Sequence, residues 1–177
     1  MQIDLSRLKM RPQQSEDFHL EEQGSNDFLQ GTGCSFLDKI VAELRVENTG
    51  RMFIARGKVK TRLGLQCSRC LQETSLPIDT DIEFTMVRAG LGGELDPDDE
   101  AIVFHGDKVD VDIPVHEAVF MAIPIIPLCQ PECKGLCPLC GKDLNQGQCS
   151  CFQKETDPRW EKLKNFQSEG GNMNGRT

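Results

Sequence analysis

Residues 52–65 read MFIARGKVKTRLGL, a long run with the character of a half-buried β-strand. Side chains at every second position of an extended strand share a face. One face of this strand is therefore expected to meet the core through Ala55, Val59 and Leu63. The opposite face is expected to carry a row of cations, formed by Arg56, Lys58, Lys60 and Arg62.

The segments around this run predict antiparallel partners for it. Residues 38–47 alternate weakly and end at the turn signal Asn48-Thr49-Gly50, so they are expected to form a hairpin with residues 52–65. Residues 75–88 are a further candidate strand, which follows a turn that contains Cys67 and Cys70. Residues 101–104 and 108–112 flank His105-Gly106-Asp107 and indicate another short hairpin.

One helix is expected to close this β-rich region. Residues 113–123 carry apolar side chains at helical spacing, namely Val115, Ala118, Val119 and Ala122. Pro114 suits a first helical turn, and Pro124 and Pro127 end the helix. The sequence therefore predicts an α+β fold: an antiparallel β-rich domain with a few helices and a C-terminal cysteine-rich unit that resembles a zinc knuckle.

The expected domain organisation follows from these patterns. Residues 1–35 are polar and glycine-containing, which predicts a partly ordered arm with one short strand near residues 3–8. Residues 36–124 are expected to form the β-rich core domain, in which the acidic, glycine-rich residues 90–100 make a solvated loop. Residues 125–155 are then the cysteine-rich unit, and residues 156–177 a short helix with a frayed tail.

Nine cysteines are the most informative part of the composition. The number is odd and Met1-Gln2-Ile3-Asp4 does not begin a secretory signal, so a cytoplasmic chain without structural disulfides is expected. Cys34 stands alone, Cys67 and Cys70 form a CxxC, and the other six are Cys129, Cys133, Cys137, Cys140, Cys149 and Cys151. Thiolates at such short spacings are typical ligands of tetrahedral Zn²⁺.

The spacing leaves the exact zinc ligands open. The most compact set of four is Cys137, Cys140, Cys149 and Cys151. Cys129 and Cys133 would then remain, and they can complete a second site with the distant Cys67 and Cys70. A single site in which Cys133 replaces Cys149 fits the spacing equally well.

Charge limits the ways in which this chain can contact a nucleic acid. With 28 acidic and 20 basic residues, the net charge of −8 argues against coating RNA by bulk charge alone. Residues 51–69, however, contain six basic residues and no acidic one. Contact with an RNA backbone through this stretch is one interpretation, and the solvated face of an amphipathic strand is the other. The candidate RNA-binding residues are Arg56, Lys58, Lys60, Arg62 and Arg69.

The sequence contains no pattern that predicts an enzyme or a membrane protein. His19, His105 and His116 are scattered, and we expect them to be surface or packing residues. Neither a nucleotide-binding glycine loop nor a GxSxG motif occurs. No apolar run approaches the roughly 18 residues that a membrane helix needs. A non-enzymatic protein without a small-molecule substrate is expected.

Two cysteine motifs are the most specific features of the sequence: Cys67-Ser68-Arg69-Cys70-Leu71 and the segment from Cys129 to Cys151, with Cys137-Pro138-Leu139-Cys140-Gly141 at its centre. These motifs resemble the YceD-like family of large ribosomal RNA subunit accumulation proteins. Asp112-Ile113, Ala122-Ile123-Pro124 and Asp157-Pro158-Arg159-Trp160 occur in matching order. The resemblance covers most of the chain after the N-terminal arm.

The resemblance implies an accessory factor that supports the accumulation or processing of large-subunit (23S-type) ribosomal RNA. Its expected partner is that RNA or a pre-ribosomal particle, including a ribosomal protein. One alternative is a metal-stabilised protein–protein adaptor that makes no direct contact with RNA. A thiol oxidoreductase that uses Cys67 and Cys70 is a further alternative, although the βαβ pattern typical of that class is absent.

Overall fold

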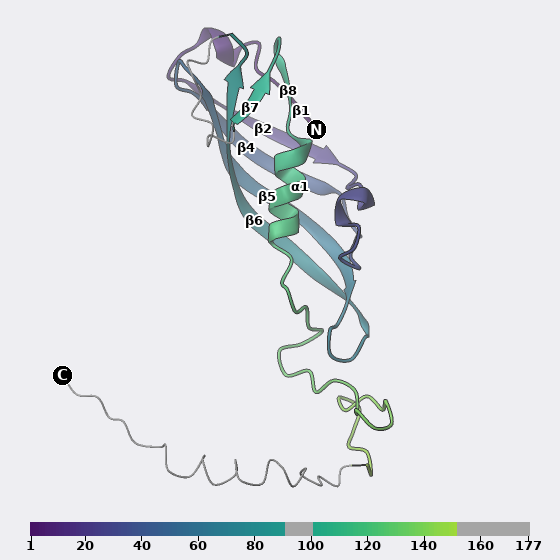
Figure 1. Cartoon of the computed structure of the whole chain (residues 1–177). Coiled ribbons are helices and arrows are strands. Elements are labelled where there is room, and N and C mark those ends of the chain that lie inside the picture. Colours follow the sequence, from purple (N-terminus) through teal and green to yellow (C-terminus); the bar gives the residue numbers. More distant parts are fainter. Residues whose placement is uncertain (91–100, 152–177) are drawn as a thin grey trace, which may run out of the picture. The chain divides into compact units, whose positions relative to one another are not determined.

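A computed structural model describes residues 1–90 and 101–151 of the chain (Figure 1). The chain divides into two compact units, Met1–Cys133 and Lys134–Thr177, which are described separately below. The expected acidic loop at residues 91–100 and the expected helix and tail at residues 156–177 lie outside the described residues.

The first unit is built on a twisted sheet with the strand order β2-β4-β5-β6-β7, in which β3 also pairs with β5 (Figure 1). Strand β6 pairs in parallel with β7, whereas the other pairs in this sheet are antiparallel. The strands are β2 (Ser15–Glu22), β3 (Ser35–Phe36), β4 (Ile40–Asn48), β5 (Phe53–Gln66), β6 (Glu73–Arg88) and β7 (Ala101–Phe104). A separate small sheet pairs β1 (Gln2–Asp4) with β8 (Lys108–Asp110).

The central hairpins lie where the sequence predicts them. Asn48 of β4 pairs with Phe53 of β5, so the chain turns through the predicted Asn48-Thr49-Gly50 signal. Strands β5 and β6 pair from Phe53 opposite Met86 to Gln66 opposite Glu73. The turn that contains Cys67 and Cys70 therefore joins the two longest strands of the sheet.

Helix α1 (Asp112–Met121) packs across one face of β5 and β6 (Figure 1). Its Val115 and Val119 are fully buried in one cluster with Ala55, Val59 and Leu63 of β5, as the alternation in β5 predicts. Fully burying an aliphatic side chain of this size stabilises a fold by about 1.5–3 kcal/mol. The predicted α+β class is confirmed. Within the described residues, no helix has the length and apolar character needed to cross a membrane.

The N-terminal residues are more ordered than the predicted polar arm. Strand β2 pairs along its length with β4, from Ser15 opposite Glu47 to Glu22 opposite Ile40. Two short 3₁₀ helices, Leu8–Met10 and Asn26–Leu29, each bury a leucine in the core. The pattern of β2 was missed because charged residues surround its two partly buried apolar side chains, Phe18 and Leu20. Pairing with β4, rather than local hydrophobic periodicity, defines this edge strand.

The predicted hairpin around residues 105–107 is wrong, although both of its strands exist. β7 pairs with β6, whereas β8 pairs with β1, so the two strands belong to different sheets. The backbone amide of Leu5 donates to the carbonyl of Asp107 over 2.8 Å and holds the start of the chain beside β8. A local pattern predicts a strand but not its partner: β7 pairs with the strand before it, and β8 pairs with the first strand of the chain.

Gly57 provides a test of the packing between β4 and β5. A Cβ atom at this position would lie 1.9 Å from the backbone carbonyl oxygen of Glu43. We expect Gly57→Ala to lower the free energy of unfolding by about 2–3 kcal/mol, because strand β4 must move to relieve the clash. Urea unfolding monitored by circular dichroism measures this change.

Gly64→Ala is the matched control in the same strand. There the nearest atom to an added Cβ is the flexible Cδ2 of Leu37, at 3.1 Å. This change is expected to cost less than about 1 kcal/mol. Equal losses for Gly57→Ala and Gly64→Ala would contradict the close approach of the two strands.

Candidate metal centres

Two short turns in the chain have the same backbone geometry, and each presents a pair of cysteines. In the first turn, the amide of Cys67 donates to the carbonyl of Gln72 and that of Leu71 to Cys67, both over 2.9 Å. In the second turn, the amide of Cys137 donates to Lys142 over 2.8 Å and that of Gly141 to Cys137 over 2.9 Å. Both CxxC turns are therefore closed by the same pair of backbone bonds, which leaves the two sulfurs of each turn on one side.

The fifth residue of each turn has a left-handed backbone conformation. Its φ angle is +60° at Leu71 and +70° at Gly141. Glycine adopts this conformation readily, whereas a leucine pays a steric cost of about 1–2 kcal/mol. The first turn therefore keeps its shape despite an unfavourable residue, so surrounding contacts must hold it. One such contact is the amide of Ser68, which donates to the carbonyl of Pro127 over 2.9 Å.

The first candidate centre lies within the unit Met1–Cys133. The sulfurs of Cys67, Cys70, Cys129 and Cys133 all lie within 4.8 Å of one another. The separation is 3.7 Å between the sulfurs of Cys67 and Cys133, and 3.6 Å between those of Cys70 and Cys129. Four sulfurs at about 2.3 Å around a tetrahedral ion would lie about 3.8 Å apart, so this arrangement fits a metal ion.

Two chain segments that are distant in sequence build this first centre. Cys67 and Cys70 come from the β5–β6 turn, and Cys129 and Cys133 come from the segment after helix α1. Arg69 joins the segments, because its Nη1 donates to the carbonyl of Cys133 over 2.7 Å. Cys67, Cys70 and Cys133 are buried and Cys129 is half-buried. A metal ion here would cross-link the end of the central hairpin to the segment that follows the helix.

The second candidate centre lies within the unit that begins at Lys134. Cys137, Cys140, Cys149 and Cys151 place their sulfurs within 4.8 Å of one another. Leu136 and Asp143 form an isolated antiparallel bridge beside the turn. The side-chain oxygen of Asn145 accepts a hydrogen bond from the amide of Lys134 over 2.8 Å. These four cysteines are the compact set that the spacing favours, and Cys133 lies in the other group.

In each group, the pKa of one cysteine thiol is lowered. Burial opposes ionisation of the Cys67 thiol, but the backbone amides of Cys70, Cys129 and Arg69 outweigh it and lower its pKa to about 6. The backbone amides of Cys140 and Leu139 lower the pKa of Cys137 to about 7.

In both groups, other cysteines have raised pKa values next to such a thiol. Burial, together with the neighbouring cysteines, raises the pKa of Cys129 to about 12. A hydrogen bond with Cys140, followed by burial, raises the pKa of Cys151 to about 11. Four thiolates cannot coexist at this distance unless a cation balances their charge. A bound metal ion would supply that charge.

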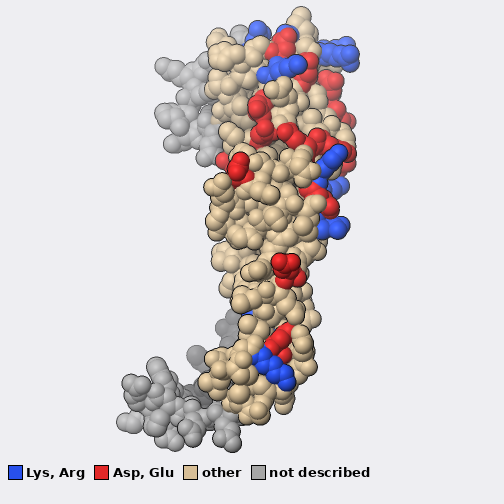
Figure 2. Space-filling view, turned by 90° about the vertical axis from the view of Figure 1, so that its right-hand side faces the viewer, with Lys and Arg blue, Asp and Glu red and all other residues tan. Residues whose placement is uncertain are grey.

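The predicted row of cations on β5 is exposed but paired with acidic side chains. Arg56 contacts Glu83 at 2.9 Å, Lys58 contacts Asp79 at 3.3 Å, Lys60 contacts Glu43 at 3.1 Å and Arg62 contacts Asp38 at 3.4 Å. Hydrogen bonding to Glu83 raises the pKa of Arg56, and bonding to Asp79 raises that of Lys58. On the face shown in Figure 2, basic side chains lie beside acidic ones rather than in a continuous stripe.

The acidic partners of this row were missed in the sequence. Glu43 and Asp38 precede β5, whereas Asp79 and Glu83 belong to β6, so no local window contains a complete pair. Strand register is the signal that reveals them, because β5 lies between β4 and β6. The fifth candidate, Arg69, bonds to the backbone of Cys133 and lies apart from the row on β5.

Cys34 and the histidines lie outside both cysteine groups. Cys34 is half-buried, and its sulfur lies 3.8 Å from the carbonyl oxygen of Thr32. His116 is buried against Phe28, with ring centroids 4.0 Å apart, and its Nδ1 lies 2.8 Å from the carbonyl oxygen of Asp112. The packing role expected for His116 is therefore confirmed.

Comparison with known proteins shows which protein family contains this chain. The family described as large ribosomal RNA subunit accumulation protein YceD matches residues 55–167, a range that contains both cysteine groups. The chain belongs to the YceD family. This match confirms the resemblance that the CxRC turn and the cysteine-rich segment indicate. Membership of the YceD family supports a role in ribosome biogenesis.

Individual relatives of this YceD-family chain come from bacteria and a plant. Proteins of Mycobacterium bovis and Mycobacterium tuberculosis, both described as uncharacterized, are 28% identical over 92% of this chain and 79% of their own length. A chloroplastic protein of Arabidopsis thaliana is 29% identical over 64% of this chain and 44% of its own length. That protein is described as a large ribosomal RNA subunit accumulation protein YCED homolog. No solved structure matches the chain.

Metal analysis of the purified protein tests the two cysteine groups. We expect two metal ions per chain, because the structure gathers two sets of four cysteine sulfurs. Cys133→Ser and Cys140→Ser are each expected to lower the content to one ion, since each removes a ligand from a different set. The measurement is elemental analysis after exhaustive dialysis.

Cys34→Ser is the control, because Cys34 belongs to neither group, and it should leave both ions in place. A metal-free wild-type chain, or loss of both ions in either single variant, would contradict two independent centres.

Proposed function

We propose that both cysteine centres bind Zn²⁺. Four cysteine thiolates in tetrahedral geometry are a typical structural zinc site, and zinc needs no further ligand there. The second unit has a particular need for it: among its described residues, Cys137 is the only buried hydrophobic side chain. A segment of this kind cannot bury enough apolar surface to fold alone, so metal binding would supply its folding free energy.

Removal of zinc should affect the two units differently. A strong chelator is expected to unfold residues 134–151, because they lack an apolar core. The sheet should persist, since β5 and β6 pack against α1 and side chains of β4 belong to the same large buried cluster. Amide NMR spectra before and after chelation measure this, and added zinc should restore the lost signals. Unfolding of the sheet and the cysteine unit together would contradict separate sources of stability.

The function that we propose is that of a non-enzymatic accessory factor in ribosome biogenesis. The protein would support the accumulation or processing of large-subunit ribosomal RNA, in the cytoplasm, through contact with that RNA or with a pre-ribosomal protein. The family match carries this proposal, because it covers the central hairpin, helix α1 and both cysteine centres. Zinc would stabilise the recognition surface and take no part in chemistry.

A second candidate, a metal-stabilised protein–protein adaptor, is favoured by one specific observation. Each cation of the row on β5 has an acidic partner within 3.4 Å, which reduces the field that an RNA backbone would meet. Under this alternative the protein reaches the pre-ribosomal particle through a protein and makes no contact with RNA. The thiol oxidoreductase alternative is weakened by the burial of both Cys67 and Cys70.

Affinity purification from cells tests the proposed function. The tagged chain should enrich large-subunit ribosomal RNA and its precursors over small-subunit RNA, measured by sequencing of the bound RNA. Deletion of the protein should lower the level of mature large-subunit RNA. If the RNA is neither enriched nor lowered, the proposed role in ribosome biogenesis fails.

Charge reversal on β5 separates direct RNA contact from the adaptor. If the row touches phosphate, a variant with Arg56, Lys58, Lys60 and Arg62 all changed to Glu is expected to lose its association with the pre-ribosomal particle. Glu43→Lys, Asp79→Lys and Glu83→Lys disturb three of the four ion pairs without removing the cations, so they serve as the control. Unchanged association of the four-residue variant would favour the adaptor.

A further inference from the structure

Helix α1 is apolar on both of its faces. One face buries Val115, His116 and Val119 against the sheet. The other face leaves Ile113 and Met121 with 62% and 81% of their surface exposed. Large apolar side chains exposed together on one face are typical of a contact surface. The outer face of α1 is therefore a candidate contact surface.

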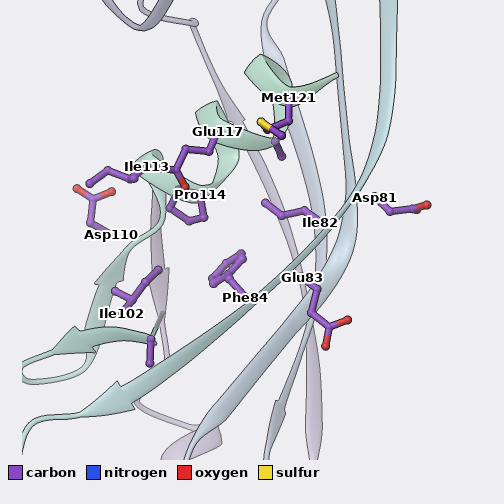
Figure 3. A pocket seen from close by; sticks show the side chains of 12 residues that line it. Asp81, Ile82, Glu83, Phe84, Ile102, Asp110, Ile113, Pro114, Glu117 and Met121 are labelled. Carbon is purple, nitrogen blue, oxygen red and sulfur yellow. The ribbon is translucent and has the colours of Figure 1, made fainter. Parts of the chain in front are cut away.

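A groove runs along this outer face, between α1 and strands β6 and β7 (Figure 3). Its volume is about 580 Å³, within the range of binding pockets. Ile82 and Phe84 point from β6 toward the helix and form its floor, and Ile113 and Met121 stand on the helix side. The groove thus has an apolar floor and one apolar wall.

The apolar surface continues beyond the helix. Ile125 and Ile126 follow α1 with 99% and 65% of their surface exposed, and Phe120 at the end of the helix is 47% exposed. Isolated exposed apolar residues are common on proteins, but several in one short segment mark an interaction site. Met121 lines the groove and is next to Phe120 at the end of α1, so one partner can contact both the groove and this apolar segment.

Charge indicates what kind of partner fits this surface. None of the described residues that line the groove is basic, and residues 109–133 contain no lysine or arginine. Asp81 and Glu83 point to the opposite side of β6, where they meet Lys58 and Arg56 (Figure 3). Asp110 and Glu117 stand at the groove itself.

Glu117 is an acidic residue of the groove whose carboxylate has no partner among the described residues. It is exposed and has no hydrogen bond or ion pair within the described residues. A phosphate backbone would be repelled by this surface, whereas a lysine or arginine would gain a partner.

We propose that the groove and the outer face of α1 dock a lysine- or arginine-rich polypeptide segment that carries apolar anchor residues. The apolar side chains enter between α1 and β6 and cover Ile113 and Met121, and a basic side chain pairs with Glu117. This mode resembles the binding of amphipathic segments in grooves, where a few anchors supply most of the affinity. The inference rests on the proposed function in one respect, because it assigns the segment to a protein of the pre-ribosomal particle.

A binding assay with a defined probe tests the proposal. The probe is a short fluorescein-labelled peptide of lysine and leucine with helical amphipathic spacing, titrated with the full chain at near-physiological salt and followed by anisotropy. Glu117→Lys and Met121→Ser are each expected to weaken binding about tenfold, because each removes a central contact. Circular dichroism and zinc content confirm that the variants are folded.

Two matched controls distinguish the groove from general surface charge. Glu73→Lys makes the same charge change at an exposed site of β6 outside the groove. Met10→Ser replaces another exposed methionine, with 76% of its surface accessible. Both controls should bind the probe like the wild type. Equal losses in the controls, or no loss in the groove variants, would overturn the proposal.

A second probe decides between a protein and an RNA partner. The second probe is a labelled single-stranded RNA of large-subunit sequence. If Glu117→Lys strengthens binding of this RNA and weakens binding of the peptide, the result supports a docking site for a basic segment. If Met121→Ser abolishes binding of RNA and leaves the peptide unaffected, the groove is an RNA site and the proposal fails. Either result leaves the proposed function open to its own test, which depends on ribosomal RNA levels in the deletion strain.

Discussion

The antiparallel pairing of β5 with β6 is the interaction on which the rest of this structure depends. It extends from Phe53 opposite Met86 to Gln66 opposite Glu73, so it sets the position of the turn that contains Cys67 and Cys70. The inner face of the same two strands receives Val115 and Val119 of α1, and the chain then continues to Cys129 and Cys133. One register therefore places the helix, the groove and half of the first metal centre.

The same register also sets the charge of the outer face. Arg56 lies opposite Glu83, and Lys58 opposite Asp81, at positions where cross-strand side chains meet. Exposed pairs of this kind contribute only about 0–1 kcal/mol each to stability. Their larger effect is on recognition, because a row of cations that looks suitable for phosphate becomes a mixed surface. The acidic, apolar groove beside α1 lies on the opposite face of β6, which separates the two surfaces.

The two candidate metal centres differ in how much of them a sequence can reveal. Cys137, Cys140, Cys149 and Cys151 lie within one short stretch, and their spacing alone makes them the most compact set. In the first centre, the paired sulfurs belong to residues 59 and 66 positions apart, so the spacing left a single-site alternative open. The shared turn geometry of Leu71 and Gly141 is visible only in the backbone, because one turn uses glycine and the other does not.

Sequence by itself determined strands β4, β5 and β6, helix α1, the buried face of β5 and the presence of cysteines at metal-ligand spacing. Each of these is a pattern within a short window, where periodicity or ligand spacing carries the information. Tertiary structure alone decided the place of β2 and the partners of β7 and β8. It also decided which acidic side chains lie beside the β5 cations, and it brought Cys67 and Cys70 together with Cys129 and Cys133. These features depend on contacts between residues that are far apart in the chain, and only the packing of the whole unit specifies which of them meet.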